Sequence, residues 1–373
     1  MKNKELCIET QIQLNNIFKK KKNQLNYKET LFFIAKCLTI SLEDKNRDEI
    51  EIILKTTDVD WDAVVKVSTS HYVFPAIYCN FKRADFLKYL PADLVNYMKH
   101  ITDLNRDRNK QIISQAQDLN TLLLKNNITP IFLKGTGNLL EGLYGDIAER
   151  MVGDIDFLLS KKDSSSAFKI LKSDNYYTAE NLLNNPPDHR HFPRLVKQEN
   201  IAAVEIHKEV TIEKHIGEFN YKIISEDAQQ INDFLVLNFE NQLSLSIIAS
   251  QINDSGFNLK KISLRNAYDV FLLSKKVDTK KAISKFTKLN NTLNCFLANC
   301  NLVFGDIESL KYNKTEEVEN YLKAFNKSLY RNKSTINFKL IRINLYRKFG
   351  KFCKSIINSE YRKWLLNRLK SKL

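Results

Sequence analysis

Residues 151–160, MVGDIDFLLS, place two aspartates, Asp154 and Asp156, inside an apolar run. Apolar flanks of this kind predict a strand, although acidic pairs two residues apart also occur in surface turns. Residues i and i+2 of a strand project from the same face. Two carboxylates that face together repel one another unless a proton or a cation lies between them, and burying them unpaired is costly. We therefore expect Asp154 and Asp156 to share a cation.

The sequence on either side of this strand predicts a small sheet with helices. Short apolar runs at 128–135 and 202–210 are typical of strands, and the segments 136–145 and 162–177 have the pattern of helices. Strands and helices that alternate in this way indicate a small mixed sheet, which we expect at the centre of an α+β fold.

Helical patterns precede and follow this sheet. Apolar residues recur there at three- and four-residue spacing, and the last part of the chain is strongly basic. We expect an N-terminal helical region, a core that holds the sheet, a second helical region and a basic helical tail, with the boundaries 1–125, 126–230, 231–310 and 311–373.

Composition limits the class of protein. Of the 373 residues 43% are hydrophobic, which excludes wholesale disorder, and no apolar window reaches the roughly 18 residues of a membrane span. The N-terminus lacks the apolar centre of a signal peptide. The six cysteines are spread out without a CxxC motif, which predicts reduced thiols rather than a disulfide or a zinc site. We expect a cytoplasmic protein.

Most of the net charge of +15 belongs to the end of the chain. Residues 331–373 hold thirteen Lys and Arg against one acid, Glu360, and so carry +12. Basic and apolar residues interleave there in a pattern typical of an amphipathic helix. Such a helix packs on its own protein, lies on an anionic membrane or follows nucleic-acid phosphates. The sequence leaves all three open, and the second would place the protein peripherally at the inner membrane surface.

A third acid and a candidate phosphate-binding turn accompany the two aspartates. Glu205 lies in AVEIHKEV, which predicts a strand beside that of Asp154 and Asp156. Carboxylates on adjacent strands can hold one or two divalent cations, and Mg²⁺ accepts oxygen ligands from carboxylates and from substrate phosphates. Lys134 and Gly135 stand at a predicted strand-to-helix junction, where a cation and free backbone N–H groups favour phosphate.

Together these motifs resemble a known family. Its pattern is Leu-Lys-Gly after an apolar strand, then a Tyr, an Arg, an Asp-x-Asp strand, a His-rich turn and an acid-x-His strand. The chain fills these places with Leu133-Lys134-Gly135, Tyr144, Arg150, Asp154-Ile155-Asp156, His191 and Glu205-Ile206-His207. It resembles the bacterial uncharacterised nucleotidyltransferases, a family of the DNA-polymerase-β-like nucleotidyltransferase superfamily. Weaker similarity extends over residues 30–305.

The resemblance implies a nucleotidyltransferase core and its reaction. A nucleoside monophosphate would pass from an NTP to a hydroxyl, with release of pyrophosphate, and the acceptor would be a small molecule, a glycan precursor, a protein or RNA. The resemblance implies Mg²⁺, with Mn²⁺ as an alternative, held by three catalytic carboxylates, Asp154, Asp156 and Glu205. A non-catalytic nucleotide- or RNA-binding protein on the same fold is the alternative.

The resemblance also implies contacts with the nucleotide. Lys134, Gly135 and Thr136 would contact the triphosphate, although Lys-Gly-Thr departs from the Gly-Ser pair of better-studied nucleotidyltransferases. Arg150 would do the same, or would instead form an ion pair with a nearby carboxylate, that of Asp146 or Asp154.

Histidines form the last group of candidates. His207 and His191 are expected to contact substrate, with a structural role as the alternative. For His71 we expect packing or capping in the N-terminal helical region. Three residues that match the family pattern are expected to be structural: Tyr144, Arg265 and Asp269.

Overall fold

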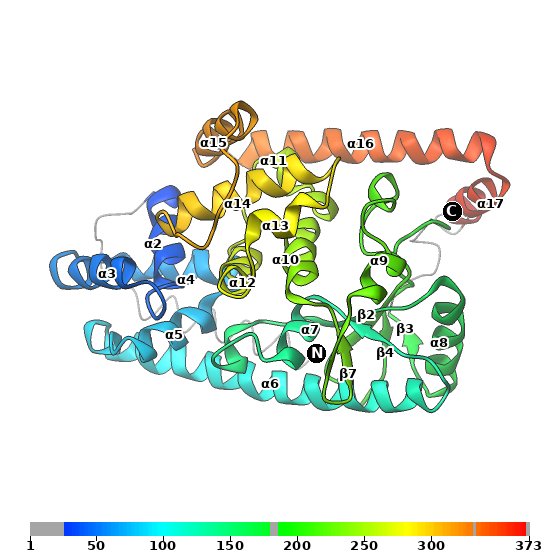
Figure 1. Cartoon of the computed structure of the whole chain (residues 1–373), viewed down its shortest axis with the longest axis horizontal. Helices are drawn as coiled ribbons and strands as arrows, with labels where there is room; N and C mark the ends of the chain where they lie inside the picture. Colours follow the sequence, from blue (N-terminus) through cyan, green and yellow to red (C-terminus); the bar gives the residue numbers. More distant parts are fainter. Residues whose placement is uncertain (1–25, 180–185, 331–332, 371–373) are drawn as a thin grey trace.

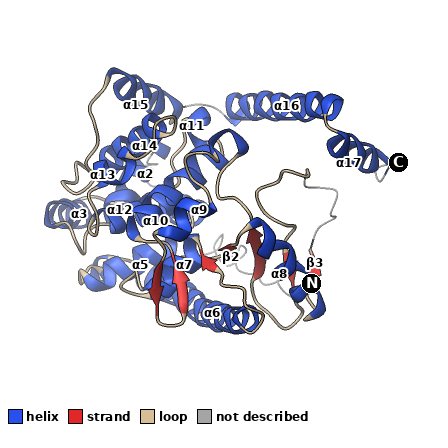
Figure 2. Cartoon of the chain, turned by 45° about the vertical axis from the view of Figure 1, so that its right-hand side comes forward, coloured by secondary structure: helices blue, strands red, loops and turns tan. Residues whose placement is uncertain are grey.

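The computed structural model of the protein describes residues 26–179, 186–330 and 333–370. It has the predicted α+β fold, in which a seven-stranded mixed sheet is accompanied by helices (Figure 1). The strands gather in one part of the molecule, and helices make up the rest (Figure 2).

The strand order of the sheet is β3-β4-β5-β2-β1-β7-β6. At its centre, β2 runs parallel to β5 and antiparallel to β1. Ile155 and Phe157 of β2 are fully buried, so the strand predicted within residues 151–160 is confirmed. The strands are β1 (Ile131–Phe132), β2 (Asp154–Leu158), β3 (Tyr177–Thr178), β4 (Leu195–Val196), β5 (Ala203–His207), β6 (Gln229–Ile231) and β7 (Phe234–Val236).

The sheet extends one strand past the predicted core boundary at residue 230. Strand β7 pairs in parallel with β1 and antiparallel with β6. The β6–β7 hairpin turns at Asn232, which adopts a left-handed conformation with φ of 51°. Its two strands have three residues each, which is too short for a clear alternation of apolar and polar residues.

Helix α7 (Lys134–Glu141) follows β1 and begins two residues before the predicted start at Thr136. It packs closely on the strand before it. A Cβ atom on Gly137 would lie 2.7 Å from the carbonyl oxygen of Phe132, so only glycine permits this approach. The glycine therefore fixes the position of the first turn of α7, which borders the candidate site.

The long helix α6 (Ala92–Leu124) connects the helical part of the molecule with the sheet (Figure 1). Its Gln115 side chain forms two hydrogen bonds with the backbone of Ala202, of 2.9 and 3.1 Å, directly before β5. Asn120 donates to the carbonyl oxygen of Asp233 between β6 and β7. The Gln115 bonds hold the strand that carries Glu205 against the helix, and the Asn120 bond holds the β6–β7 hairpin there.

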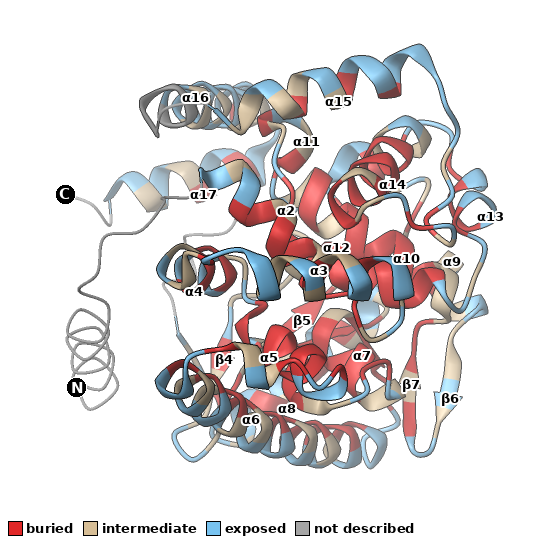
Figure 3. Ribbon diagram, turned by 90° about the vertical axis from the view of Figure 1, so that its left-hand side faces the viewer, coloured by how far each residue is buried: buried red, intermediate tan, exposed pale blue. Residues whose placement is uncertain are grey.

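The other helices pack around a shared apolar core, whose buried residues line their inner faces (Figure 3). Asn46 donates to the carbonyl oxygen of Phe304, which joins the N-terminal helices to the second helical region. The Nδ1 atom of His71 accepts the backbone N–H of Leu264 at the start of α12. The predicted capping role of His71 is thus confirmed. These helices are α2 (Tyr27–Cys37), α3 (Asp44–Thr56), α4 (Trp61–Ser70), α5 (Phe74–Arg83), α8 (Lys161–Ser173), α9 (Tyr221–Glu226), α10 (Phe239–Ile248), α11 (Gly256–Leu259), α12 (Leu264–Ser274), α13 (Thr279–Ser284), α14 (Asn290–Phe304) and α15 (Glu316–Ser328).

Two helices, α16 (Lys333–Ile357) and α17 (Ser359–Lys370), lie within the range expected for the basic tail, whereas α15 in the same range packs into the core. Figure 2 shows them at the edge of the molecule, away from the sheet and most of the other helices. Within the described ranges, no helix has the length and apolar character needed to cross a membrane. The described cysteines are free thiols, and the remaining one, Cys7, lies outside the described residues: Cys37, Cys79, Cys295, Cys300 and Cys353.

Candidate active site

The three predicted carboxylates lie on one face of the sheet. In the parallel register Asp156 of β2 is directly opposite Glu205 of β5, and Asp154 is opposite Ala203. Side chains opposite each other in neighbouring strands project to the same side. Asp156 and Glu205 are buried, with 7% and 6% of their surface exposed, and Asp154 is half-buried. The strand period therefore brings Asp154, Asp156 and Glu205 together.

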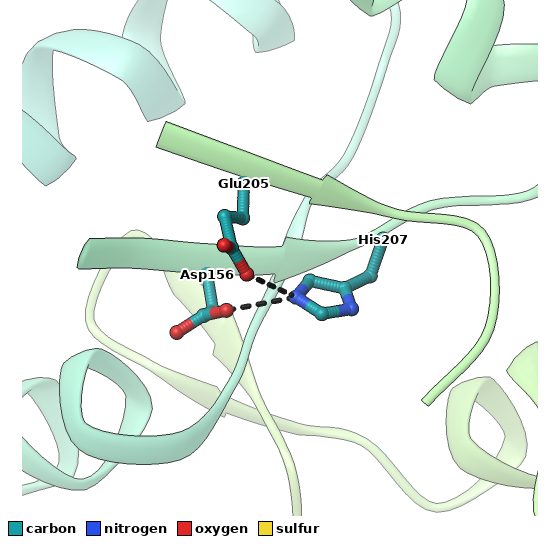
Figure 4. Close-up of side chains that lie close together, drawn as sticks. All are labelled: Asp156, Glu205 and His207. Atoms are coloured by element: carbon teal, nitrogen blue, oxygen red, sulfur yellow. Dashed lines mark hydrogen bonds and ion pairs between the residues drawn. The ribbon is translucent and has the colours of Figure 1, made fainter. Parts of the chain in front are cut away.

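His207, two residues after Glu205, points to the same place (Figure 4). Its Nε2 atom lies 2.7 Å from Oδ1 of Asp156 and 3.4 Å from Oε2 of Glu205. Donor atoms of the three residues lie within 4.8 Å of one another, a spacing suited to a metal ion. Asp154 is outside this group, so the candidate ligand set differs from the predicted one, Asp154, Asp156 and Glu205.

Lys134 reaches this cluster from the first position of α7. Its Nζ atom lies 2.6 Å from Oδ1 of Asp156 and 3.9 Å from Oε2 of Glu205. The backbone of Lys134 is left-handed, with φ of 53°, a conformation that costs energy for a residue with a side chain. The turn between β1 and α7 therefore sets the lysine over the carboxylates at the expense of local strain.

Arg194 is a site residue that the sequence reasoning missed. Its guanidinium bridges two carboxylates, with 2.9 Å to Oδ2 of Asp154 and 2.8 Å to Oε1 of Glu205. It stands immediately before β4, which pairs with β5. The only local signal was a basic residue after the His-rich turn, DHRHFPRL. Arg194 and Lys134 together neutralise much of the negative charge of the cluster.

Burial and neighbouring charges shift the ionisation of the cluster. Burial is the main cause of the raised pKa of Asp154. The charge of Arg194 lowers this pKa, and the charge of Glu205 raises it further. For Glu205, burial alone would raise the pKa. The hydrogen bond with His207 and the charge of Lys134 outweigh burial and hold the pKa of Glu205 well below its usual range.

The His-rich turn contributes a second imidazole. His191 forms an isolated β-bridge with His207, and its Nε2 atom lies 4.0 Å from Oε2 of Glu205. Burial lowers the pKa of His191 to about 3, so its ring is neutral at pH 7 and the contact with Glu205 is not an ion pair. The structure therefore places both His191 and His207 beside the carboxylates, but of the two only His191 lines the cavity described below.

A cavity of about 440 Å³ opens beside the cluster. Its wall carries five Lys and Arg side chains and four Asp and Glu side chains, and cations of this kind suit a polyphosphate. Arg190, His189 and Asp254 line it but were not among the predicted site residues, and Arg265 lines it although we expected a structural role. The charged residues of the wall are Lys134, Arg150, Arg190, Arg194, Arg265, Asp154, Asp156, Glu205 and Asp254.

The comparison with family models identifies the chain. Residues 57–304, more than half of the sequence, match the family described as uncharacterised nucleotidyltransferase. The chain belongs to this family. The match covers every strand of the sheet and the cavity wall of this nucleotidyltransferase family member, so the resemblance seen in its motifs is confirmed. The comparison with curated proteins gives no match.

Two solved structures are similar to this family member at low identity. JHP933 from Helicobacter pylori is 12% identical, with a TM-score of 0.28, and the alignment covers 63% of this chain and 97% of that one. A candidate nucleotidyltransferase from H. pylori is 13% identical, with a TM-score of 0.26 and a coverage of 68% and 99%. TM-scores of this size do not by themselves establish a common fold.

Arg150 forms a buried ion pair within this nucleotidyltransferase family member, and it also lines the cavity. Its guanidinium is buried and lies 3.0 Å from Oδ2 of Asp269, whose Oδ1 accepts the hydroxyl of Tyr144 at 2.7 Å. The predicted pairing of Arg150 with Asp146 or Asp154 is therefore wrong. Asp269 comes from α12, a helix distant in sequence, and local spacing could not indicate that contact. Tyr144 and Asp269 are structural, as expected.

The three residues of the Lys-Gly-Thr turn lie in different surroundings. Gly135 lines the cavity, and a Cβ atom there would lie 3.0 Å from Val152. The side chain of Thr136 is buried, and its hydroxyl donates to the carbonyl oxygen of Asp154 at 3.1 Å. Thr136 therefore anchors the start of α7 to β2, whereas Lys134 and Gly135 face the cavity.

Proposed function

We propose that this family member is a metal-dependent nucleotidyltransferase, which transfers a nucleoside monophosphate from an NTP to a hydroxyl-bearing acceptor. The observation that carries the proposal is the register that sets Asp156 against Glu205 on adjacent parallel strands, beside a cavity rich in Arg and Lys. The family supports a nucleotide as one substrate. The proposed acceptor is a small molecule, a glycan precursor, a protein or RNA.

The proposed metal ligands are Asp156, Glu205 and His207. Two carboxylates and an imidazole fit a divalent cation, and the nitrogen donor favours Mn²⁺ over Mg²⁺, which prefers oxygen. A bound cation would neutralise charge on the phosphates and make the α-phosphorus easier to attack. On binding of the cation, Lys134 would exchange its contact with Asp156 for one with the triphosphate.

The chain's own cations are proposed to bind the triphosphate. Lys134, Arg190 and Arg265 line the cavity and would form charge-assisted hydrogen bonds with phosphate oxygens. Gly135 lies in the first turn of α7, where backbone N–H groups have no partner within the helix. Thr136 and Arg150 would support this surface from within, because their polar groups are already bonded to the protein.

In the proposed reaction, the acceptor hydroxyl oxygen forms a bond to the α-phosphorus of the NTP. The bond from that phosphorus to the bridging oxygen breaks, and pyrophosphate leaves with the electron pair. The hydroxyl proton passes to a carboxylate. Asp154 is the proposed acceptor of this proton, because it lies at the cavity wall but outside the group of candidate metal ligands.

The experiment that tests the proposal is calorimetric titration of the protein with ATP, GTP, CTP and UTP, with Mn²⁺, with Mg²⁺ and with neither. We expect metal-dependent binding of at least one NTP. Asp156→Asn should abolish the metal dependence, whereas Asp107→Asn, at an exposed ion pair on α6, should leave it unchanged. Metal-dependent binding that survives in Asp156→Asn would show that the ligand assignment is wrong.

One observation favours a second candidate, a protein that binds nucleotides without catalysis. Arg194 and Lys134 already contact all three carboxylates, so two of the three negative charges are offset by the chain itself. Under this alternative, an NTP would bind equally well with a metal chelator present. The calorimetric titration in EDTA distinguishes the two, because the proposed enzyme requires the cation for productive binding.

A further inference from the structure

The tail helix α16 exposes a continuous apolar stripe to solvent. Of the twenty large apolar side chains that are exposed among the described residues, ten lie in α16 and α17. Six of them follow one another at spacings of three and four residues, which places them on one face of α16. Each is more than half exposed: Phe338, Ile341, Leu345, Phe349, Phe352 and Ile356.

The opposite face of α16 holds the helix to the rest of the protein. Arg347 donates to the hydroxyl of Ser255 at 2.7 Å, and Lys354 lies 2.7 Å from Asp188. Leu340 and Ile343, on the same side, are half-buried. The helix is thus attached through this face, and its apolar stripe is directed away from the molecule. This is the reverse of the usual arrangement, in which the apolar face packs inward.

The charge around the stripe has one sign. The sequence of α16 contains seven Lys and Arg and no Asp or Glu. Arg342 and Lys348 are exposed beside the stripe. Between α16 and α17 lies a groove of about 530 Å³, whose wall combines a tryptophan and two leucines with four cations: Arg347, Lys348, Lys351 and Arg368.

We propose that α16 and α17 form a docking surface for an anionic lipid membrane. The apolar stripe would enter the interface, and the flanking Lys and Arg would contact acidic headgroups, as in amphipathic helices that lie in the plane of a bilayer. With 25 residues, α16 is roughly 37 Å long and would lie along the surface. The proposal concerns binding alone and does not rest on the proposed transfer reaction.

Charge and apolarity together favour a membrane over the other occupants of this face. Nucleic acid would satisfy the cations but would leave the apolar stripe in water. A second copy of the chain would cover the stripe, but it would bring two helices without acidic residues side by side, and their like charges would repel. An anionic bilayer satisfies both features at once.

The test is co-sedimentation of the full chain with vesicles of phosphatidylcholine alone or mixed with phosphatidylglycerol. We expect binding to the mixed vesicles only, weakened by salt. Ile341→Ser/Leu345→Ser should lower this binding by at least about tenfold. The matched control, Ile52→Ser/Leu104→Ser, removes one exposed Ile and one exposed Leu from α3 and α6 and should bind as the wild type does.

Companion measurements distinguish the other occupants. Arg342→Gln/Lys348→Gln should weaken binding and reduce its dependence on salt, because it removes charge and keeps the stripe. Equal binding of the stripe variant and the wild type would overturn the proposal. It would also be overturned if the wild type ignored both kinds of vesicle and bound RNA. A dimer in sedimentation velocity that the stripe variant abolishes, without vesicle binding, would favour a second copy instead.

Discussion

The ammonium group of Lys134 lies 2.6 Å from the carboxylate of Asp156. The contact spans the turn from β1 into α7, and the lysine holds a left-handed backbone conformation to make it. In the absence of a divalent cation, the lysine is thus the counter-ion of the most central carboxylate in the site. The same ammonium group faces the cavity, where a triphosphate would compete for it.

Replacing Lys134 should change the affinity for a metal-bound nucleotide and the affinity for the metal alone in opposite directions. Lys134→Met keeps most of the side-chain volume and removes the charge. We expect the affinity for the Mn²⁺–ATP complex to fall by about tenfold, since a charge-assisted hydrogen bond to phosphate is lost. Affinity for Mn²⁺ alone should rise, because the competing ammonium group is gone. Calorimetric titrations with each ligand measure both, and unchanged values for both would remove Lys134 from the site.

The ion pair between Arg150 and Asp269 should matter for stability. Both side chains are buried, and the two residues come from segments far apart in the sequence. Removing one partner of a buried pair leaves an uncompensated charge, which typically costs about 3–5 kcal/mol. We expect Asp269→Asn to lower the free energy of unfolding by about this amount in urea titrations. Burial raises the pKa of Asp269 although the charge of Arg150 lowers it. We therefore expect the loss of unfolding free energy to lie toward the lower end of the range of about 3–5 kcal/mol.

The exposed ion pair Lys110–Asp107 on α6 provides the control for this comparison. Asp107→Asn should change the free energy of unfolding by less than about 1 kcal/mol, because exposed pairs are screened by solvent. If the two variants unfolded alike, the Arg150–Asp269 pair would have no special structural role, and Arg150 would again be a candidate phosphate ligand.

Strand periodicity and short motifs predicted the centre of this site. Asp154, Asp156 and Glu205 were predictable because the two-residue period of a strand fixes which side chains share a face. Lys134 was predictable because the junction before α7 is local in sequence. A packing or capping role was predicted for His71, but the sequence did not indicate its partner on α12.

The remainder of the site depends on contacts that no local pattern contains. Arg194 meets Glu205 because β4 turns back on β5, and Arg150 meets Asp269 because α12 packs against the site. Both pairings required the tertiary structure. The direction of the apolar stripe on α16 also required the tertiary structure. Periodicity defines one face of the helix, but only the packing shows that this face points outward.

The tail also contacts the loop that carries the site histidines. Lys354 of α16 lies 2.7 Å from Asp188, and the hydroxyl of Tyr361 in α17 donates to the same carboxylate. Asp188 directly precedes His189, which lines the cavity. Asp188→Asn removes the charge that anchors this loop, so we expect the affinity for Mn²⁺–ATP to fall about threefold to tenfold with little change in the melting temperature.

The control for this prediction is Lys311→Gln, which breaks an exposed ion pair with Asp278, a residue that does not line the cavity. It should leave nucleotide affinity unchanged. A loss of affinity in Lys354→Gln of the same size as in Asp188→Asn would assign the effect to the tail contact. Equal affinity of Asp188→Asn and the wild type would show that the tail does not position the loop.

His71 should make stability depend on pH. Burial lowers its pKa from 6.5 to about 4, and the charge of Lys261 acts in the same direction. The neutral ring accepts the N–H of Leu264 at Nδ1. The unfolded chain therefore binds more protons below pH 6.5, and stability falls as the pH drops from 6.5 toward 4, by at most about 3 kcal/mol. Urea titrations at pH 7.5 and 5 should show a smaller loss in His71→Asn, whose amide oxygen can accept the same N–H without titrating. Other buried histidines, such as His191, are present in both proteins and cancel in the difference. An identical loss in both proteins would mean that His71 is not the titrating group.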